Sequence, residues 1–317
     1  MEYIIGIAIL IVSAILYLKL ATKYNIVDNP NFRSSHTIPT IRGGGILFLI
    51  AILGFFIASG FQYPYFIIGT IIIAALSFID DILTLSAKIR LPFQFIAVGL
   101  LLIQVGLFSW PLYVAILVAI IAVGFINIYN FMDGINGITG LYSLVVLAGF
   151  FALNSINQQV DTNLIVYVLL SIVVFGYYNF RKKARMFAGD VGSISVAMVI
   201  LFLVLTFIIN LKAPVVLLLI AVYGIDSGLT ILYRIYLKEH IMEPHRHHIY
   251  QKLVDVWKWS HLKVSYVYSF IQVIISSIVI LSFKLPFSAQ LLISVGVLIL
   301  MSVGYMLVFK KMKLKLQ

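Results

Sequence analysis

The chain has 317 residues, of which 62% are hydrophobic and only 10% are charged, with a mean hydropathy of +1.11 and a formal net charge of +11. Soluble domains are roughly 45–50% apolar and about 25% charged, so this composition excludes an ordinary globular protein. The chain has no cysteine, which excludes disulfides, thiolate metal sites, iron–sulfur clusters and cysteine nucleophiles.

Eleven apolar stretches predict membrane-spanning helices, because a hydrocarbon core about 30 Å thick needs about 20 apolar residues per helix. They cover residues 3–21, 43–60, 64–80, 92–108, 111–129, 138–153, 163–179, 191–210, 214–233, 264–283 and 286–309. Glu2 stands where a signal peptide would carry basic residues, so we expect the first stretch to be a retained helix. The loops are short. We therefore predict an all-α, polytopic integral membrane protein whose residues 1–317 form a single domain.

The basic residues predict the orientation of these spans. If the N-terminus is outside, 20 of the 22 Lys and Arg residues fall in inside segments, and only Lys212 and Lys284 lie outside. This agrees with the positive-inside rule and places the C-terminus in the cytoplasm. Topology thus explains the positive charge, and no nucleic-acid partner is expected. All six histidines and most acidic residues are also inside, so we expect cytoplasmic loops to form the active site.

The first inside loop contains His36 and Arg42 and ends in Gly43, Gly44 and Gly45, directly before the second span. Backbone amides in such a glycine run, beside the positive end of a helix, are suited to bind an anionic group. Alternatively, the loop only fixes topology and the glycines allow close helix packing.

Asp80 and Asp81 end the third span, and Arg90 follows across a short turn. Adjacent carboxylates repel each other, so they indicate a cation or a basic partner nearby. Mg²⁺ relieves such repulsion and typically takes one or two carboxylates together with substrate phosphates and waters. The alternative is that the two aspartates cap a helix at the membrane boundary.

The fifth span ends in a turn that contains no Lys or Arg, although it lies inside. This departure from the topogenic pattern favours a functional role. Asn127 and Asn130 are one helical turn apart, and Gly134 and Gly137 permit a tight loop that presents amides and Asp133 to a ligand. Helix capping is the alternative.

The loop before the eighth span reads Phe187-Ala188-Gly189-Asp190-Val191-Gly192-Ser193. Asp190 stands where an N-cap residue is expected, and capping is the ordinary explanation for an aspartate there. The same position would also place a metal-binding carboxylate beside free helix amides that receive phosphate oxygens.

The longest inside loop contains His245, Arg246, His247 and His248. Zinc is disfavoured, because one short segment seldom supplies all the ligands of a tetrahedral site and no cysteine completes it. We interpret these residues as donors to a diphosphate or to the charge that develops in phosphoryl transfer, with a solvated polar loop as the alternative.

Asp226 is the carboxylate expected at hydrocarbon depth, and Arg234, two turns later, is a candidate partner. This residue motivates a rival class, a secondary transporter. Transporters tend to place coupling residues at the midplane between repeated halves, whereas this sequence shows no repeat and its acids gather at one face.

Together these loops resemble the polyprenyl-phosphate N-acetylhexosamine-1-phosphate transferase family, of the glycosyltransferase family 4 type. The resemblance extends in order over essentially the whole chain. Its most specific segments are Asp80-Asp81, residues 127–134, residues 187–193 and the histidine loop. The histidine loop and Arg33-Ser34-Ser35-His36 look more like the branch that initiates O-antigen and enterobacterial antigen than like the peptidoglycan phospho-MurNAc-pentapeptide translocase, which stays the alternative within the enzyme class.

The resemblance implies transfer of N-acetylhexosamine 1-phosphate from a UDP-sugar to undecaprenyl phosphate, with release of UMP. The sugar would be GlcNAc or a 6-deoxy relative such as QuiNAc or FucNAc, and the product would enter cell-surface polysaccharides such as lipopolysaccharide. The implied cofactor is Mg²⁺, with Mn²⁺ as a substitute. The implied partners are the UDP-N-acetylhexosamine, undecaprenyl phosphate and the lipid bilayer, and a homodimer is compatible. The implied location is the bacterial inner membrane, with the active site on the cytoplasmic face.

The resemblance also assigns roles to residues. Asp190 is implied as a magnesium ligand, Phe187 as a neighbour of the uracil, and His245 and His248 as contacts of the donor phosphates. The implied catalytic residues are Asp80, Asp81, Asp133, Asp190, His245 and His248, and the implied metal ligands are Asp80, Asp81 and Asp190. The implied substrate-binding residues are His36, Arg42, Asn127, Asn130, Gly134, Asn136, Phe187, Arg246 and His247. Asn136 stands where the family often has an acidic residue, which argues against a further carboxylate role at this position.

The chemistry of such a transfer does not require a nucleophilic side chain, because phosphoryl transfer is mostly positioning and electrostatics. A phosphate monoester has a second pKa of about 6, so the lipid phosphate is mostly dianionic at neutral pH. We therefore expect it to attack the β-phosphorus directly, without an aspartyl-phosphate intermediate.

Overall fold

A computed structural model describes residues 1–30, 38–83, 85–240 and 245–313 of the chain. The helices of the first half are α1 (Glu2–Lys23), α2 (Ile46–Ala58), α3 (Pro64–Leu83), α4 (Ala87–Gln104), the 3₁₀ helix η1 (Leu107–Ser109), α5 (Leu112–Phe131) and α6 (Ile138–Ile156). Those of the second half are α7 (Thr162–Asn179), α8 (Gly189–Leu211), the 3₁₀ helix η2 (Pro214–Ile220), α9 (Ala221–Tyr236), α10 (Ile249–Asp255), α11 (His261–Ser282) and α12 (Phe287–Lys313). Two short strands, β1 (Val27–Asp28) and β2 (Thr40–Ile41), lie between α1 and α2.

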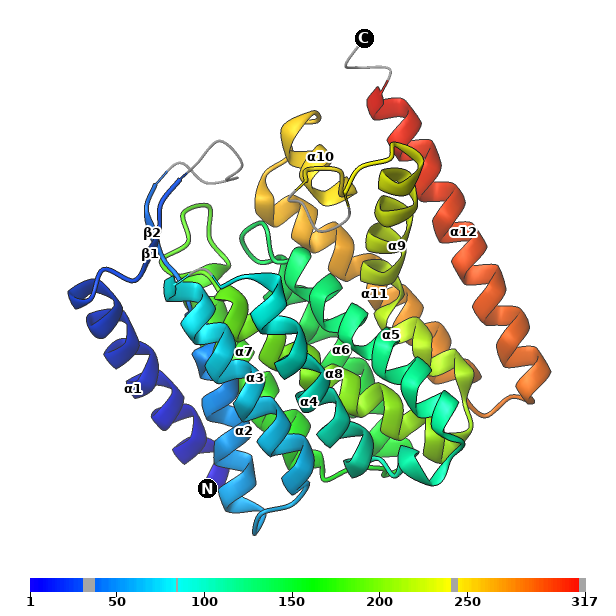
Figure 1. The fold of residues 1–317 in the computed structure, drawn as a ribbon, viewed down its shortest axis with the longest axis horizontal. Helices are drawn as coiled ribbons and strands as arrows, with labels where there is room; N and C mark the ends of the chain where they lie inside the picture. The colour runs from blue at the N-terminus through cyan, green and yellow to red at the C-terminus, as the bar shows by residue number, and fades with distance from the viewer. Residues whose placement is uncertain (31–37, 84, 241–244, 314–317) are drawn as a thin grey trace.

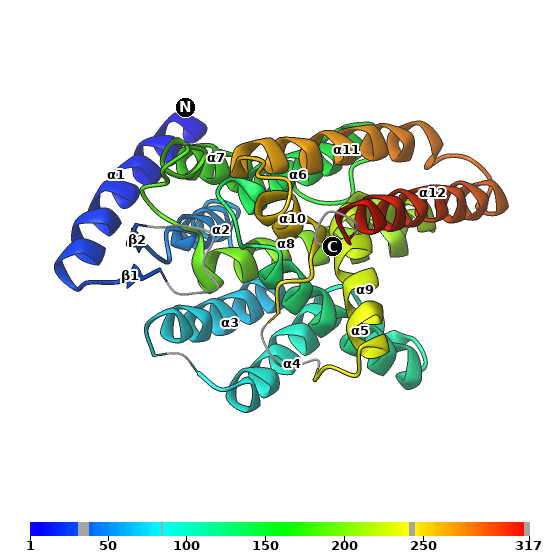
Figure 2. The ribbon, with the colours of Figure 1, turned by 90° about the horizontal axis from the view of Figure 1, so that it is seen from above.

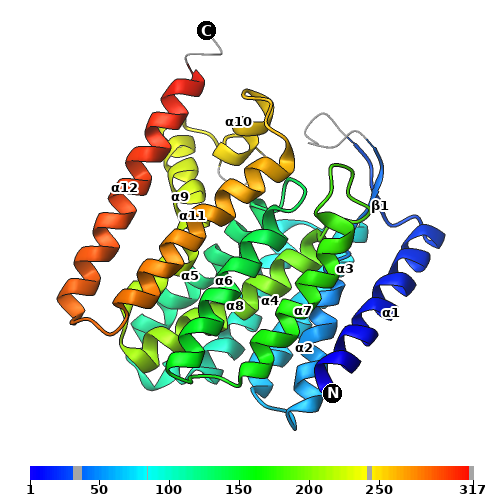
Figure 3. The same cartoon turned by 180° about the vertical axis from the view of Figure 1, so that it is seen from behind.

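The predicted polytopic membrane fold is confirmed. In the described residues, ten helices are long and apolar enough to cross a membrane, with η2 and α9 forming one of them as Pro214–Tyr236. The remaining expected span is α2, an apolar helix of 13 residues, which at 1.5 Å per residue is about 20 Å long. The N-terminus lies at one end of the bundle, and the strands, α10 and the C-terminal end of α12 lie at the other (Figures 1 and 3).

Helix α8 lies at the centre of the bundle (Figure 2). In the 18-residue apolar stretch that marks α8 as a span, 67% of the residues are buried, the largest fraction among the ten spans. Every residue from position 191 to 204 is buried, which is typical of a helix that is apolar on all sides. In contrast, no residue in the corresponding 18-residue apolar stretch of α12 is buried. This helix runs along the outside of the bundle (Figure 1). The start of α8 is therefore held by neighbours on every side, as a site built on it requires.

Two features at the end of the bundle that carries the predicted inside loops, a strand pair and a short helix, were not predicted from the sequence. The strands β1 and β2 pair antiparallel, with Val27 opposite Ile41, and Ile41 also forms a parallel bridge with Met186. The short helix α10 follows the histidine loop. Both elements depend on contacts between distant segments, and both are too short to show a hydrophobic period.

Candidate active site

The glycine run after Arg42 packs α2 directly against the start of α8. The amide of Gly44 donates to the Phe187 carbonyl at 2.8 Å, and the amide of Gly45 donates to the Ala188 carbonyl at 2.9 Å. A Cβ atom added to Gly45 would meet the backbone of Gly192, 2.9 Å from its nitrogen. The structure therefore supports the close-packing interpretation of this run. Since both amides are used internally, they are not available to an anion.

Asp81 anchors the first turn of α8 from the neighbouring helix α3. Its Oδ1 accepts the amide of Asp190 at 2.9 Å, and its Oδ2 accepts the amide of Val191 at 3.2 Å. The N-cap position belongs to Ala188, which makes no side-chain cap. The interpretation of Asp190 as an N-cap is thus wrong, because Asp81 supplies the capping carboxylate and leaves the Asp190 side chain free to point elsewhere.

Asp190 is the carboxylate at which three donors meet. Its Oδ1 accepts from Arg42 Nη2 at 2.9 Å, and its Oδ2 accepts from Asn130 Nδ2 at 3.2 Å and from Arg90 Nη1 at 3.5 Å. Ser193 holds the Asn130 amide in place by donating to its Oδ1 at 2.7 Å. The Asp190 side chain keeps 14% of its surface exposed, so this carboxylate is oriented by its donors and still accessible.

Two arginines link the three aspartates that were predicted as metal ligands into one network. Arg42 Nε lies 2.7 Å from Asp81 Oδ1 while its Nη2 pairs with Asp190, and Arg90 Nη1 lies 2.8 Å from Asp80 Oδ2. Burial lowers the pKa of Arg42, but the charges of Asp81 and Asp190 outweigh this effect and raise it above its ordinary value. Sequence reasoning did not select Arg90 as a site residue. Its position ten residues after Asp80 was the available signal.

The carboxylates differ in how well they fit a metal ion. Within the described ranges, no three His, Asp or Glu side chains converge tightly enough to hold a metal by themselves. This suits Mg²⁺ bound partly by substrate phosphates and waters. Asp190 fits as a hard, partly exposed oxygen ligand. Both carboxylates already accept hydrogen bonds, but Asp81 fits less well, because it caps the backbone of α8 and its side chain has no exposed surface.

The turn after α5 presents Asp133 beside this network. The pKa of Asp133 is raised to about 6, mainly by burial; a hydrogen bond with Thr139 opposes this rise, the charge of Asp190 adds to it, and the charge of Arg42 opposes it. Asn127, by contrast, pairs with Gln94 of α4 through two amide hydrogen bonds of 2.8 and 3.1 Å. The structure thus places Asn130 and Asp133 at the network and engages Asn127 in a contact between helices.

The same turn is packed against α10. Tyr250 Oη donates to the Phe131 carbonyl at 3.0 Å, and a Cβ atom on Gly134 would collide with that hydroxyl. Asn136 Nδ2 donates to the carbonyls of Arg181 and Lys182 at 2.9 and 3.2 Å. Gly134 and Asn136 therefore join the loops at this end of the bundle to one another.

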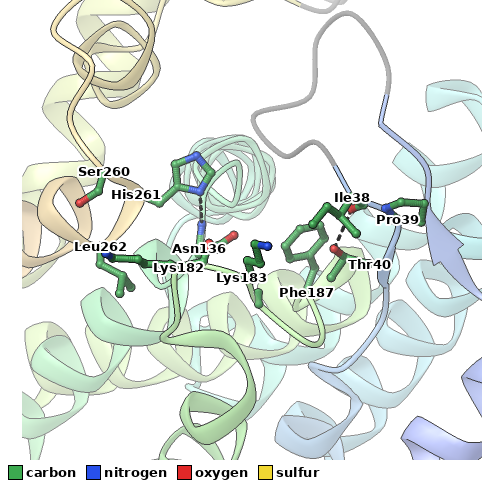
Figure 4. Close-up of a pocket in the computed structure, with 11 residues that line it drawn as sticks. Ile38, Pro39, Thr40, Asn136, Lys182, Lys183, Phe187, Ser260, His261 and Leu262 are labelled. Atoms are coloured by element: carbon green, nitrogen blue, oxygen red, sulfur yellow. Dashed lines mark hydrogen bonds between the residues drawn. The ribbon is translucent and has the colours of Figure 1, made fainter.

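A cavity of about 440 Å³ opens next to this turn. Figure 4 shows Asn136 and His261 on one side of it, Phe187 and Thr40 on the other, and Lys183 between them. Its lining residues are Ile38, Pro39, Thr40, Asn136, Lys182, Lys183, Ala184, Phe187, Ser260, His261 and Leu262. Phe187 and Asn136 were expected here, whereas the lysines and His261 were missed because a basic loop is explained by topology alone. His36 lies outside the described residues.

The histidine loop is held by ion pairs of its own. His248 Nδ1 lies 3.3 Å from Asp226 Oδ1, His247 Nε2 lies 2.9 Å from Glu239 Oε1, and Arg246 pairs with Asp255 through two contacts of 2.9 and 3.1 Å. Burial and the positive charges of His248 and Arg234 lower the pKa of His245 to about 4. The loop meets the turn of Asp133 through Tyr250.

The expected pairing of Asp226 with Arg234 is wrong. Arg234 donates from Nε to Glu239 at 3.1 Å and from Nη2 to the His240 carbonyl at 2.6 Å. Asp226 instead contacts the segment 248–250, which returns along α9. A pairing along one helix was predicted because the path of the following loop is not visible in the sequence.

Comparison with known proteins adds two findings. The sequence model described as glycosyl transferase family 4 matches residues 63–208, which include the Asp80-Asp81 pair, the turn of Asp133 and the Phe187 to Asp190 segment. A protein of Bacillus subtilis (strain 168), described as a probable undecaprenyl-phosphate N-acetylglucosaminyl 1-phosphate transferase, is 25% identical over 265 residues. The alignment covers 74% of this chain and 72% of that relative. Both findings agree with the resemblance drawn from the motifs.

Proposed function

Because residues 63–208 belong to glycosyl transferase family 4, we propose that this membrane protein transfers N-acetylhexosamine 1-phosphate from a UDP-sugar to undecaprenyl phosphate and releases UMP. The description of the Bacillus subtilis relative supports both the lipid acceptor and GlcNAc as the sugar. A 6-deoxy relative of GlcNAc is the second choice. We place the reaction on the cytoplasmic face of a bacterial plasma membrane, in agreement with the distribution of basic loop residues.

One observation carries this proposal. The segment from Phe187 to Asp190 borders the cavity at one end and the ion network at the other. An aromatic ring and the polar groups of Asn136 and His261 in the cavity suit a nucleobase and ribose. Lys182 and Lys183 on the same lining suit phosphate oxygens. A nucleoside diphosphate sugar bound in this cavity would therefore extend its diphosphate toward Asp190.

The proposed chemistry is a single displacement. An oxygen of the dianionic lipid phosphate forms a bond to the β-phosphorus of the donor, and the bond from that phosphorus to the oxygen shared with the α-phosphate breaks. UMP leaves with that oxygen, so the number of diphosphate bonds is conserved. Arg42 and Arg90 are charged, fixed by their carboxylate partners and placed to neutralise the charge of the transferring group.

The implied metal fits the donor set at Asp190. Mg²⁺ would be held there by this carboxylate and by the substrate phosphates, with Asp80 as the neighbouring carboxylate. When bound, it would supply Lewis-acid polarisation of the phosphoryl oxygens. Asn130 orients Asp190 for this role, and Asp81 keeps the first turn of α8 in place.

The test is a transfer assay on purified protein with undecaprenyl phosphate, Mg²⁺ and a panel of UDP-N-acetylhexosamines, in which UMP release is measured. We expect release that needs both lipid and metal and that is lost in Asp190→Asn. Asp161→Asn serves as the matched control, because Asp161 accepts the Asn163 amide at the start of α7, away from the site. UDP-MurNAc-pentapeptide in the panel tests the translocase alternative. Silence across the whole panel with folded protein would contradict the proposal.

A second assay tests the single displacement. Labelled UMP is mixed with protein, Mg²⁺ and UDP-sugar in the absence of lipid acceptor. We expect no label to enter the UDP-sugar, because the direct mechanism has no enzyme-bound phosphosugar that returns to UMP. Rapid exchange would indicate a covalent intermediate and overturn this part of the proposal.

A further inference from the structure

A buried carboxylate that the proposed mechanism does not use lies under the histidine loop. Asp226 of α9 is only 3% exposed, and it lies ten residues before Tyr236, where α9 ends. A carboxylate inside a membrane-spanning helix is costly unless it is paired, and such residues mark functional sites.

Five donors use the carboxylate of Asp226. Oδ1 accepts the amide of Ile249 at 3.0 Å and Thr230 Oγ1 at 3.4 Å, and it lies 3.3 Å from His248 Nδ1. Oδ2 accepts Tyr268 Oη at 2.6 Å and the amide of Tyr250 at 3.4 Å. The amide contacts cap the short helix α10, and the imidazole contact fixes the ring that stands immediately before it.

The imidazole contact determines which nitrogen of His248 is left over. An ionised carboxylate only accepts hydrogen bonds, so the proton facing Asp226 lies on Nδ1. His248 is 3% exposed, and within the described part of the chain its Nε2 has no hydrogen-bond partner although it is buried. An unpaired buried nitrogen is unfavourable, and a ligand atom would relieve this. The ring is thus oriented on one side and unsatisfied on the other.

We propose that Asp226 is the positioning residue of His248, which it orients through Nδ1 so that Nε2–H of the imidazolium donates to a phosphate oxygen of the donor diphosphate. This inference rests on the proposed function. Asp226 itself touches no substrate and acts through the imidazole. Orienting partners of this kind contribute about 10–100-fold to activity in metal-ligand pairs of the same geometry, and the same range is expected here.

A double-mutant cycle tests the coupling. UMP release is measured for Asp226→Asn, His248→Ala and the double variant. We expect Asp226→Asn to lower kcat by about 10–100-fold and to change the KM for the UDP-sugar much less. In the His248→Ala background the same substitution should change kcat by less than about 3-fold, because residues that act as a unit are not additive. Equal effects of Asp226→Asn in both backgrounds would overturn the proposal.

A matched variant separates the capping role from the positioning role. Ile249→Pro removes the amide that donates to Asp226 but keeps the carboxylate and the imidazole. Proline is tolerated at the first position of a helix, and His248 already has the φ of −59° and ψ of 143° that a residue before proline prefers. We expect this variant to keep kcat within about 5-fold of the parent. A loss as large as that of Asp226→Asn would assign Asp226 a structural role only.

A spectroscopic readout keeps this inference separate from the proposed function. In protein labelled with ¹⁵N-histidine, the signals of His248 are identified by their loss in His248→Ala. We expect a protonated Nδ1 whose resonance moves in Asp226→Asn and stays in Asp161→Asn. An unchanged resonance in Asp226→Asn would refute the pairing. This readout does not depend on catalytic activity. If no UDP-sugar yields UMP, the proposed function is refuted, and the NMR spectra still test the pairing of Asp226 with His248.

Discussion

Asp81 offers a sharp test of whether a predicted metal ligand is instead an anchor. Replacing Asp81 with Asn keeps the shape of the side chain but leaves one neutral oxygen where two charged ones accept the amides of Asp190 and Val191. Hydrogen bonds to charged groups contribute about 1.5–3 kcal/mol each, against about 0.5–1.5 kcal/mol for neutral ones. Arg42 also loses its contact of 2.7 Å. Together these losses predict a destabilisation of about 2–4 kcal/mol.

The assay compares thermal unfolding of Asp81→Asn and Asp190→Asn in detergent, at one scan rate because membrane proteins often unfold irreversibly. We expect Asp81→Asn to lower the unfolding midpoint by several degrees, and Asp190→Asn to lower it less while abolishing UMP release. An unchanged midpoint for Asp81→Asn, together with complete loss of activity, would refute the anchoring role and return Asp81 to the predicted metal ligands.

Three further predictions concern the packing, the pH profile and the cavity. In Gly45→Ala the new Cβ would stand 2.8 Å from the Ala188 carbonyl oxygen, so α2 and α8 must separate; overpacking of about 1–3 kcal/mol should lower the unfolding midpoint, and an unchanged midpoint would count against the close contact. The resemblance implies Asp133 as a catalytic carboxylate, and burial raises its pKa to about 6, so we expect activity to fall as pH falls through about 6. The same shift destabilises the fold progressively as pH rises from the ordinary value of 3.8 to about 6, and fully above that. Asp133→Asn should therefore raise the unfolding midpoint more at pH 8 than at pH 5; equal changes at both pH values would contradict the shift. Lys183→Ala should raise the KM for the UDP-sugar by about 10-fold and leave kcat nearly unchanged. This is the effect expected for loss of one charge-assisted hydrogen bond of about 1.5 kcal/mol. An effect on kcat alone would show that this lysine does not bind the donor.

The membrane fold could be predicted from the sequence because its signal is local. Length, apolar content and the positions of Lys and Arg determine spans one at a time, and all but one of the eleven expected spans reach full length in the described residues. The exception, α2, is short because the segment before Ile46 is pulled into backbone pairing with the segment that ends at Ala188. That pairing joins positions more than 140 residues apart and leaves no periodic trace.

The chemistry of the site was predictable by residue type and less so by role. Asp190, Asn130 and Arg42 come from segments far apart in the sequence. The structure brings their side chains into contact, as expected for one active site built from several loops. A sequence does not show which of two adjacent aspartates faces inward, and so the anchoring contacts of Asp81 were not foreseen. The partner of Asp226 was misassigned for a related reason, since spacing along one helix suggested Arg234 while the chain folds back to bring His248 nearer.

The contact between Gly45 and Gly192 has a consequence for biogenesis. The chain is synthesised from its N-terminus, so the first seven helices exist before α8. At that stage Arg42 can already pair with Asp81, and Arg90 with Asp80. Asp190 and the two amides that Asp81 accepts arrive only with α8, so the ion network is completed late in assembly.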